Sequence, residues 1–389
     1  MQPYSPERRT ALVMCGTGAH GAYQAGVLRA VQEAGVKIDV MAGQGIGAAS
    51  AAVAAIDGIS QLSEAGGLWR TDAVRRLYRR RLFTWPMHAR RTARERWWRT
   101  VGSAPIDSTR AQAAFAEAAW RLVRGAAHLD RPDTAALGRR YVELLSENLG
   151  APGFRELMIV ATDLDARRDL VAALLKEPYR REFAAPRPER ERQAEIADLA
   201  GTGRDLAFDM VAGALTPPVC SEPHMMRFAA DSYWRGETHR ICDRPGAVAR
   251  LLEELAAAGV SQAIIVSAVP APPAPHRLSS VRLEPRHRLS EFLSAAESSA
   301  LDSAVETARL RFDSVYVIRP AHNPIGCFDL TGAYDEASDR RQTLTELMQG
   351  AYEDAYHQFI EPVVGGSGEQ LARHASSHTS DVTHQKSVV

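Results

Sequence analysis

Residues 38–56 read IDVMAGQGIGAASAAVAAI, and this stretch decides the fold class because a glycine-rich turn joins two different elements in it. Residues 38–42 (IDVMA) are apolar apart from Asp39 and are predicted as a short buried strand. The glycines at 43, 45 and 47 then turn the chain, and the alanine-rich segment that follows to about residue 56 favours a helix. A buried strand, a glycine turn and a helix in this order predict an α/β sheet.

The rest of the chain repeats this alternation. Residues 11–15 (ALVMC) are a second apolar run, and a glycine-rich turn and an amphipathic helix that ends at Gly35 follow it. Further segments are predicted as strands at residues 157–162, 262–268 and 314–318, and as helices at residues 246–258, 289–310 and 342–359. The alternation predicts a sheet that is mainly parallel, with helices on both faces.

The composition excludes several classes of protein. Lys+Arg and Asp+Glu both total 47 in the 389 residues, so no net charge directs the chain to nucleic acid. The four cysteines are scattered without a C-x-x-C pair, which excludes a zinc ribbon or a disulfide scaffold. No run approaches the 18 or so apolar residues of a membrane span, and no signal-type segment precedes the first strand. We therefore expect a reduced, cytoplasmic protein.

Residues 75–99 depart from this composition, because they hold ten arginines against one acid, Glu95, and three of the six tryptophans. Three interpretations are open: a solvated helical face, a surface that docks on anionic lipid headgroups, or a nucleic-acid contact. No other feature supports nucleic acid, so we expect no such partner. In the lipid interpretation, which would place the protein at the membrane periphery, the contact residues are Arg90, Arg91, Trp97 and Trp98.

The C-terminal segment, residues 363–389, has too few apolar side chains to offset the entropy of ordering, so we expect a disordered tail. It carries three histidines (His374, His378 and His384) that could bind a metal adventitiously. A solvated tail is the simpler interpretation, and no metal or cofactor is expected for this protein.

The first turn, residues 16–21, reads GTGAHG and matches G-x-G-x-x-G between a strand and a helix. This motif suggests a dinucleotide-binding fold, in which an acid at the end of the second strand holds the ribose. The only candidate acid is Asp39, which stands at the start of that strand. A dinucleotide-binding oxidoreductase therefore stays only as a second alternative.

The second turn, residues 43–47, has the context of a nucleophile elbow, G-x-S-x-G. In that motif the sharp turn raises a serine above the carboxyl edge of the sheet, and backbone N–H groups of a neighbouring loop stabilise the oxyanion. The pattern indicates acyl transfer, but Gly45 stands at the position of the serine.

These two turns resemble the start of a bacterial patatin-like phospholipase. The matching segments are VMCGTGAHGAYQAGVLRAV at residues 13–31 and IDVMAGQGIGAASAA at residues 38–52, and NPIGCFDLTGAYDEASDRR and GAYEDAYHQF near the C-terminus are also similar. The resemblance implies a three-layer α/β/α fold over residues 11–362, after an N-terminal extension at residues 1–10. It also implies a helical, Arg- and Trp-rich insert at about residues 70–150.

The resemblance further implies lipid acyl hydrolysis by a Ser–Asp dyad without a cofactor. The positions that match the oxyanion loop are Gly16, Thr17, Gly18, Ala19 and Gly21, with His20 at the basic position, and those that match the elbow are Gly43, Gly45 and Gly47. Asp231, in ADSYW at residues 230–234, is the best match for the dyad acid.

The departures from the family pattern fall on the chemistry. Gly45 replaces the serine, Thr17 replaces an oxyanion-loop glycine, and Ser232 replaces the glycine after the acid. Threonine fits poorly wherever φ is positive. Three departures at one site favour natural loss of activity over an engineered or misread Gly45. We therefore expect a catalytically impaired protein that binds a lipid or a partner, with an active lipid acyl hydrolase that uses another group or water as the alternative.

Other side chains near the turns are candidates to replace the missing catalytic groups. Cys15 ends the first strand, where a buried structural thiol is the simpler interpretation. Ser50 lies about one and a half helical turns beyond Gly45, so its hydroxyl should point away from the elbow. His224 and His239 flank Asp231, but without a placed serine we expect both to be surface histidines.

Overall fold

A computed structural model provides the structure of the chain. It describes residues 4–71, 74, 78, 151–186, 192–200, 206–218, 221–230, 232–271 and 285–365. Most of the expected insert at 70–150 and nearly all of the expected tail at 363–389 lie outside these residues, as do Asp231 and the basic segment with Arg90, Arg91, Trp97 and Trp98.

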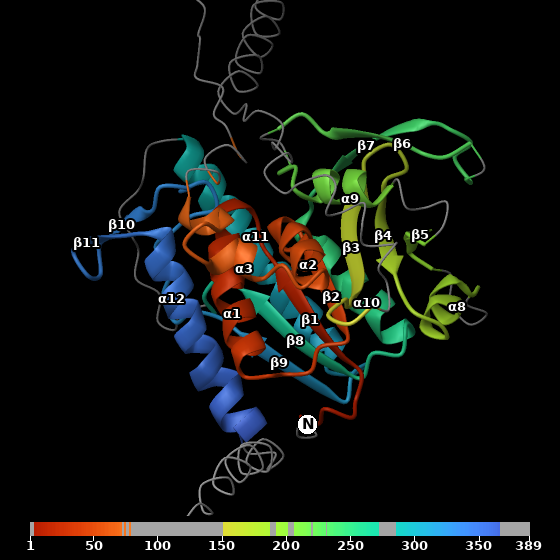
Figure 1. Cartoon of the computed structure of the whole chain (residues 1–389). Helices are drawn as coiled ribbons and strands as arrows, with labels where there is room; N and C mark the ends of the chain where they lie inside the picture. The colour runs from red at the N-terminus through yellow and green to blue at the C-terminus, as the bar shows by residue number, and fades with distance from the viewer. Residues whose placement is uncertain are drawn as a thin grey trace, which may run out of the picture.

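The described residues contain a nine-stranded sheet whose main path runs β5-β4-β3-β2-β1-β8-β9. Its strands are β1 (Thr10–Cys15), β2 (Val40–Gln44), β3 (Glu156–Asp163), β4 (Arg168–Leu174), β5 (Ala194–Asp198), β8 (Gln262–Ser267) and β9 (Ser314–Ile318). Along this path only β3 and β4 pair antiparallel, and every other pair is parallel. The expectation of a mainly parallel sheet is therefore confirmed (Figure 1).

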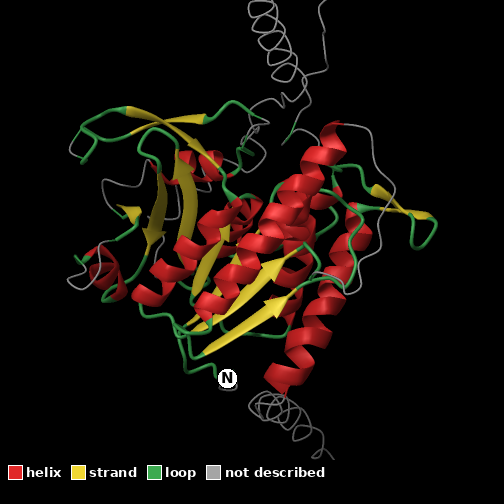
Figure 2. Ribbon diagram, turned by 180° about the vertical axis from the view of Figure 1, so that it is seen from behind, coloured by secondary structure: helices red, strands yellow, loops and turns green. Residues whose placement is uncertain are grey.

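Helices cover both faces of this sheet. Successive residues of a buried strand face opposite sides, so each strand contributes side chains to both of the cores that these helices form. Leu12 and Met14 of β1 pack into a core with α1 (Gly21–Glu33), α2 (Ile46–Ala55), α9 (Leu206–Ala214) and α12 (Leu344–Ala355). Ala11 and Val13 of the same strand pack into a second core with α10 (Val248–Ala257) and α11 (Pro285–Ala308). The fold has the three α/β/α layers that the sequence predicts (Figure 2).

Two further strands, β6 (His224–Arg227) and β7 (Thr238–Cys242), form an antiparallel hairpin that was not predicted. The end of β7 also pairs with the end of β3, where Thr162 lies opposite Cys242 and Asp163 lies opposite Ile241. The hairpin thus pairs with the carboxyl end of β3. The chain that follows β7 therefore lies at the edge of the sheet where the two glycine turns lie.

The remaining α-helices and strands of the described residues are α3 (Ser60–Ser63), α8 (Tyr179–Ala184) and the small hairpin of β10 (Ala333–Asp335) and β11 (Arg340–Gln342). The helix predicted at 342–359 starts two residues later, because Thr343 forms a capping box with Glu346 and thereby sets the first turn. Of the helices in the described ranges, none is long and apolar enough to cross a membrane.

Candidate active site

The elbow between β2 and α2 is present in the fold. Gly45 directly precedes α2 and has φ 63° and ψ −131°, a conformation that is almost confined to glycine. Two residues later, the backbone of Gly47 lies so close to the carbonyl oxygen of Met14 that a Cβ atom at residue 47 would overlap with it. The chain therefore keeps the tight turn of a nucleophile elbow although its central residue carries no side chain.

A backbone carbonyl fills the space above this elbow. A Cβ atom built on Gly45 would lie well inside 3.0 Å of the Gly16 oxygen, which is closer than real Cβ atoms approach another atom. The same oxygen accepts a 2.7 Å hydrogen bond from the backbone N–H of Ile46. In an elbow, the N–H of the residue after the nucleophile is one of the two donors to the oxyanion. Here that donor is paired with the Gly16 carbonyl.

The expected oxyanion loop follows β1, as the sequence predicts, but its contacts are internal. The backbone N–H of Ala19 donates to the carbonyl oxygen of Cys327 at 2.7 Å. Thr17 has φ −119°, an extended conformation that any residue adopts, so the penalty that threonine pays at a positive φ does not arise here. Its hydroxyl is buried and donates to Oδ2 of Asp243 at 3.0 Å.

Asp243 is the carboxylate that lies against the elbow. A Cβ atom on Gly45 would be 3.0 Å from its Oδ2, and its Oδ1 accepts a hydrogen bond from the side-chain amide of Gln44. Burial raises the pKa of Asp243 to about 7, although the hydrogen bonds from Gln44 and Thr17 oppose the rise. A carboxyl group so placed could act as a general base toward a hydroxyl at residue 45.

Asp243 was not predicted as a site residue. Asp231, which the motif match predicts as the acid, lies outside the described residues, and its neighbours Ala230 and Ser232 belong to the turn that connects β6 to β7. Ser232 donates both its backbone N–H and its hydroxyl to the carbonyl oxygen of Ala229, which closes this turn locally. The sequence feature that could have marked Asp243 is its position directly after the apolar end of β7 and before a helix that begins with proline.

A second buried carboxylate lies on the other side of Gly16. Glu297 of α11 accepts a hydrogen bond from the Ser267 hydroxyl at 3.1 Å, and Nδ1 of His20 lies 3.5 Å from its other oxygen. The negative charge of Glu297 adds to the rise in the pKa of Asp243. A cluster of polar side chains therefore surrounds the Gly16 peptide at the carboxyl edge of the sheet. All its side chains are buried.

The other candidate side chains are buried or make structural hydrogen bonds. Burial raises the pKa of the Cys15 thiol far above its usual range, so this side chain stays a protonated, buried thiol. The Ser50 hydroxyl donates to the side chain of Gln24 at 2.7 Å, away from the elbow as expected. Asp39 lies before the amino end of β2, where its carboxylate accepts the backbone N–H of Thr10. That position is at the wrong edge of the sheet to bind a ribose at the turns.

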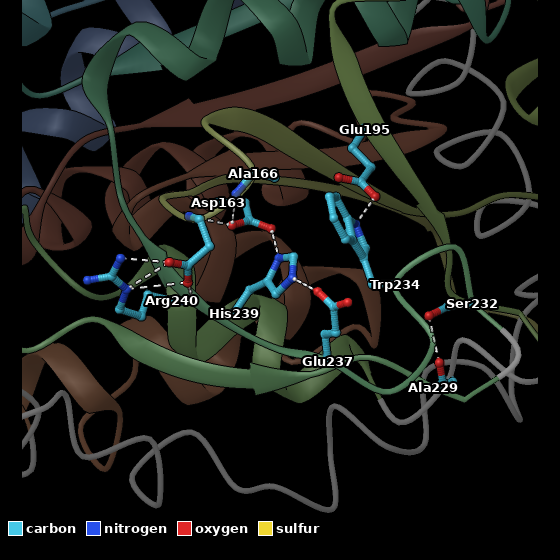
Figure 3. Close-up of polar contacts among 10 residues, drawn as sticks. Asp163, Ala166, Glu195, Ala229, Ser232, Trp234, Glu237, His239 and Arg240 are labelled. Carbon is cyan, nitrogen blue, oxygen red and sulfur yellow. Dashed lines mark hydrogen bonds and ion pairs between the residues drawn. The ribbon is translucent and has the colours of Figure 1, made fainter.

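The two histidines near Asp231 differ from each other. His224 is partly exposed and lies 3.0 Å from Asp209. His239 is only 4% exposed, so our expectation of a surface histidine is wrong there. Its ring lies inside the β6–β7 hairpin, between Asp163 and Glu237 (Figure 3). Within the described ranges, no group of three or more His, Cys, Asp or Glu side chains is arranged to hold a metal ion.

Comparison with known proteins gives one family. The family model described as patatin-like phospholipase matches residues 12–202, which include both glycine turns. Among solved structures, the crystal structure of VipD from Legionella pneumophila is similar, with 15% sequence identity and a TM-score of 0.36. That match covers 90% of this chain and 66% of VipD, so the chain spans just under two thirds of its length. Among curated proteins, none matches the chain.

Proposed function

The chain is patatin-like over residues 12–202, and on that premise we propose that it is a family member that binds a lipid or a protein partner without hydrolysing an ester. The observation that carries this proposal is the Gly16 carbonyl, which fills the space that a nucleophile side chain at residue 45 would need. Substitution of a serine by glycine removes only the hydroxymethyl group. In this chain the neighbouring backbone also occupies the site.

The pairing of the oxyanion donors supports the same proposal. Stabilisation of a tetrahedral intermediate requires N–H groups that are free to point at the developing oxyanion. The N–H of Ile46 donates to Gly16, and the N–H of Ala19 donates to Cys327. An ester carbonyl would have to displace both of these internal acceptors before it could be polarised. Loss of a single such donor costs about 10²–10³ in rate in a working serine hydrolase.

Asp243 supports the assignment of an ancestral hydrolase site. Its Oδ2 lies 3.0 Å from the position of a Cβ atom at residue 45, and in this chain Thr17 supplies the hydroxyl that it accepts. In a functional dyad the acid would take the proton of the nucleophile hydroxyl. We propose that the Thr17–Asp243 pair replaces that contact and serves the stability of the site.

The second part of the proposal concerns the partner that the protein binds. The composition of residues 75–99, with ten arginines and three tryptophans, favours an anionic lipid surface, which would place the protein at the membrane periphery. The proposed contact residues are Arg90, Arg91, Trp97 and Trp98, and the protein would otherwise reside in the cytoplasm.

The test of the catalytic half is a comparison of the wild type with Asp243→Asn. Both proteins would be assayed against p-nitrophenyl butyrate and a fluorogenic phospholipid, and both would be treated with a fluorophosphonate probe that labels activated hydroxyls. We expect equal background hydrolysis and no labelling in both proteins. Hydrolysis by the wild type that falls tenfold or more in Asp243→Asn would establish the alternative, an active hydrolase that uses another nucleophile or water.

A further inference from the structure

His239 lies between two carboxylates inside the β6–β7 hairpin. Its Nδ1 is 2.6 Å from Oδ2 of Asp163, and its Nε2 is 3.4 Å from Glu237 (Figure 3). Asp163 ends β3 and is fully buried, whereas Glu237 precedes β7 and its side chain is 65% exposed. Of these two contacts, the one with Asp163 joins the hairpin to β3, whereas the one with Glu237 lies within the hairpin itself.

Asp163 is a fixed acceptor. Its Oδ1 accepts the backbone N–H groups of Asp165 and Ala166 at 2.9 and 3.0 Å, so only Oδ2 is directed at the ring of His239. With Nδ1–H donating to this oxygen, Nε2 is an acceptor in the neutral ring and becomes a donor only in the imidazolium. The second proton therefore lets Nε2 donate to Glu237, and it also makes the ring cationic, which strengthens the bond that Nδ1–H donates to the carboxylate of Asp163.

Two aromatic side chains pack against the ring of His239. Trp234 and Phe228 pack edge-on against the imidazole, with ring centroids 4.5 and 5.0 Å away. The indole N–H of Trp234 donates to Glu195 of β5. Burial raises the pKa of that glutamate, although the indole hydrogen bond and Arg168 oppose the rise.

Asp165 is the remaining acid that acts on His239, and the Arg240 side chain binds Asp165 at 2.6 Å. Four carboxylates, those of residues 163, 165, 195 and 237, thus interact with His239, while Arg240 and Arg168 act on two of these carboxylates, those of residues 165 and 195. Burial alone would lower the pKa of His239, but the hydrogen bonds to Asp163 and Glu237 outweigh this effect and raise it.

We propose that His239, when doubly protonated, clamps the β6–β7 hairpin to β3, so that the proton concentration controls how firmly the hairpin is held. The clamp is complete below the ordinary pKa of histidine and is lost as the pH rises through the elevated pKa of the folded protein. Above that pH the bond to Asp163 persists only as the weaker hydrogen bond of a neutral ring, and Nε2 no longer donates to Glu237. Because Asp243 directly follows β7, a weaker clamp also loosens the segment that positions this carboxylate at the elbow.

The test is amide hydrogen exchange of the full chain at several pH values between 6 and 9, expressed as protection factors so that the intrinsic effect of pH is removed. We expect the protection of residues 232–242 to fall at least about threefold over this range in the wild type. In His239→Asn, whose side-chain amide can donate to Asp163 but does not titrate, protection should not change with pH. Wild-type protection that does not depend on pH would overturn the proposal, and so would an unchanged dependence in His239→Asn.

Two further variants keep the test decisive if His239→Asn does not fold. Glu237→Gln changes an exposed side chain, and it should lower the pKa of His239, measured from the NMR titration of its Cε1 proton, and shift the exchange midpoint with it. The matched control is His224→Asn, which removes the histidine of the partly exposed His224–Asp209 pair in the same hairpin. This control should keep the wild-type pH dependence. If Glu237→Gln leaves both the pKa and the midpoint unchanged, Glu237 is not part of a clamp.

Discussion

The carbonyl oxygen of Gly16 occupies the space that a side chain on Gly45 would need, and it accepts the backbone N–H of Ile46 at 2.7 Å. These two contacts place a peptide group where a hydrolase of this kind would hold the carbonyl of its substrate. The glycine at residue 45 and the position of the Gly16 peptide are therefore coupled. A change at either residue has consequences for the other.

The first prediction concerns Gly45→Ser. A Cβ atom at this residue is strained by φ 63° and collides with the Gly16 carbonyl. We expect the free energy of unfolding to fall by roughly 1–3 kcal/mol from the backbone conformation alone, with a further loss from the collision. Urea denaturation measures this loss.

The same variant should not gain esterase activity. Gly45→Ala is the matched control, because it adds the Cβ atom without the hydroxyl and should be destabilised to a similar extent. Ester hydrolysis by Gly45→Ser above that of Gly45→Ala would mean that the Gly16 peptide moves aside readily and that the oxyanion donors become available.

The second prediction concerns the pH dependence of stability. The pKa of Asp243 is about 7 in the folded protein, against an ordinary value of about 3.9. A raised pKa means that folding favours the protonated carboxyl, so its contribution to stability is complete below about pH 4 and is lost as the pH rises to about 7. The free energy of unfolding of the wild type should therefore fall between pH 4 and 7 relative to that of Asp243→Asn. Parallel curves for the two proteins in urea titrations would contradict this expectation.

The third prediction concerns Thr17. Its hydroxyl is one of two side-chain donors to the buried carboxylate of Asp243. Thr17→Val keeps the shape and removes the donor, so stability at pH 8 should fall by about 1–3 kcal/mol. Thr17→Ser should retain most of the stability because it retains the hydroxyl. If Thr17→Val and Thr17→Ser lose equal stability, the methyl group of Thr17 matters and the hydrogen bond does not.

The fourth prediction concerns the thiols. The described cysteines (Cys15, Cys242 and Cys327) are all buried. Burial raises the pKa of Cys242 to about 12 and that of Cys15 still further, so neither forms a thiolate at neutral pH. In a Cys220→Ser background, iodoacetamide at pH 8 should label the protein only after denaturation. Labelling of Cys15 in the native protein, detected by mass spectrometry, would revive the interpretation of Cys15 as a substitute nucleophile.

The fifth prediction concerns the proposed membrane contact in the basic segment. Binding to vesicles that contain phosphatidylserine should fall steeply between 50 and 300 mM salt and should weaken in a Trp97→Ala/Trp98→Ala variant. Arg90→Gln/Arg91→Gln should reduce the binding at low salt. Vesicles of neutral phosphatidylcholine are the control, and equal binding to both vesicle types would refute the electrostatic contact.

The elements that the sequence predicts best are those whose signal is local. The strand at 11–15 is a continuous apolar run and the strand at 314–318 is apolar after Ser314, and the structure has them at Thr10–Cys15 and Ser314–Ile318. The elbow was also predictable, because three glycines at alternate positions are needed for close backbone approach and for the positive φ of Gly45. Patterns of this kind depend on neighbouring residues alone.

The hairpin and its acid were missed because their signals depend on distant partners. The strand β6 contains only HMMR, whose polar ends hide the apolar alternation of a strand. Asp243 is recognisable as a site residue only when β7 pairs with β3 and brings it to Gln44, which is 199 residues away in the chain. The local motif match points to Asp231, which lies outside the described residues, whereas the contacts that place Asp243 at the elbow are long-range.

The packing of α1 against α12 bears on how the protein is made. The two helices lie side by side (Figure 1). Tyr23 of α1 donates to Asp354 at 2.8 Å, and the backbone of Gly26 lies directly against the carbonyl oxygen of Met348. During translation α1 leaves the ribosome long before α12 is synthesised, so the face of α1 that packs against α12 stays uncovered while more than 300 further residues are added. Truncated chains that lack α12 would consequently expose that face to chaperones and proteases.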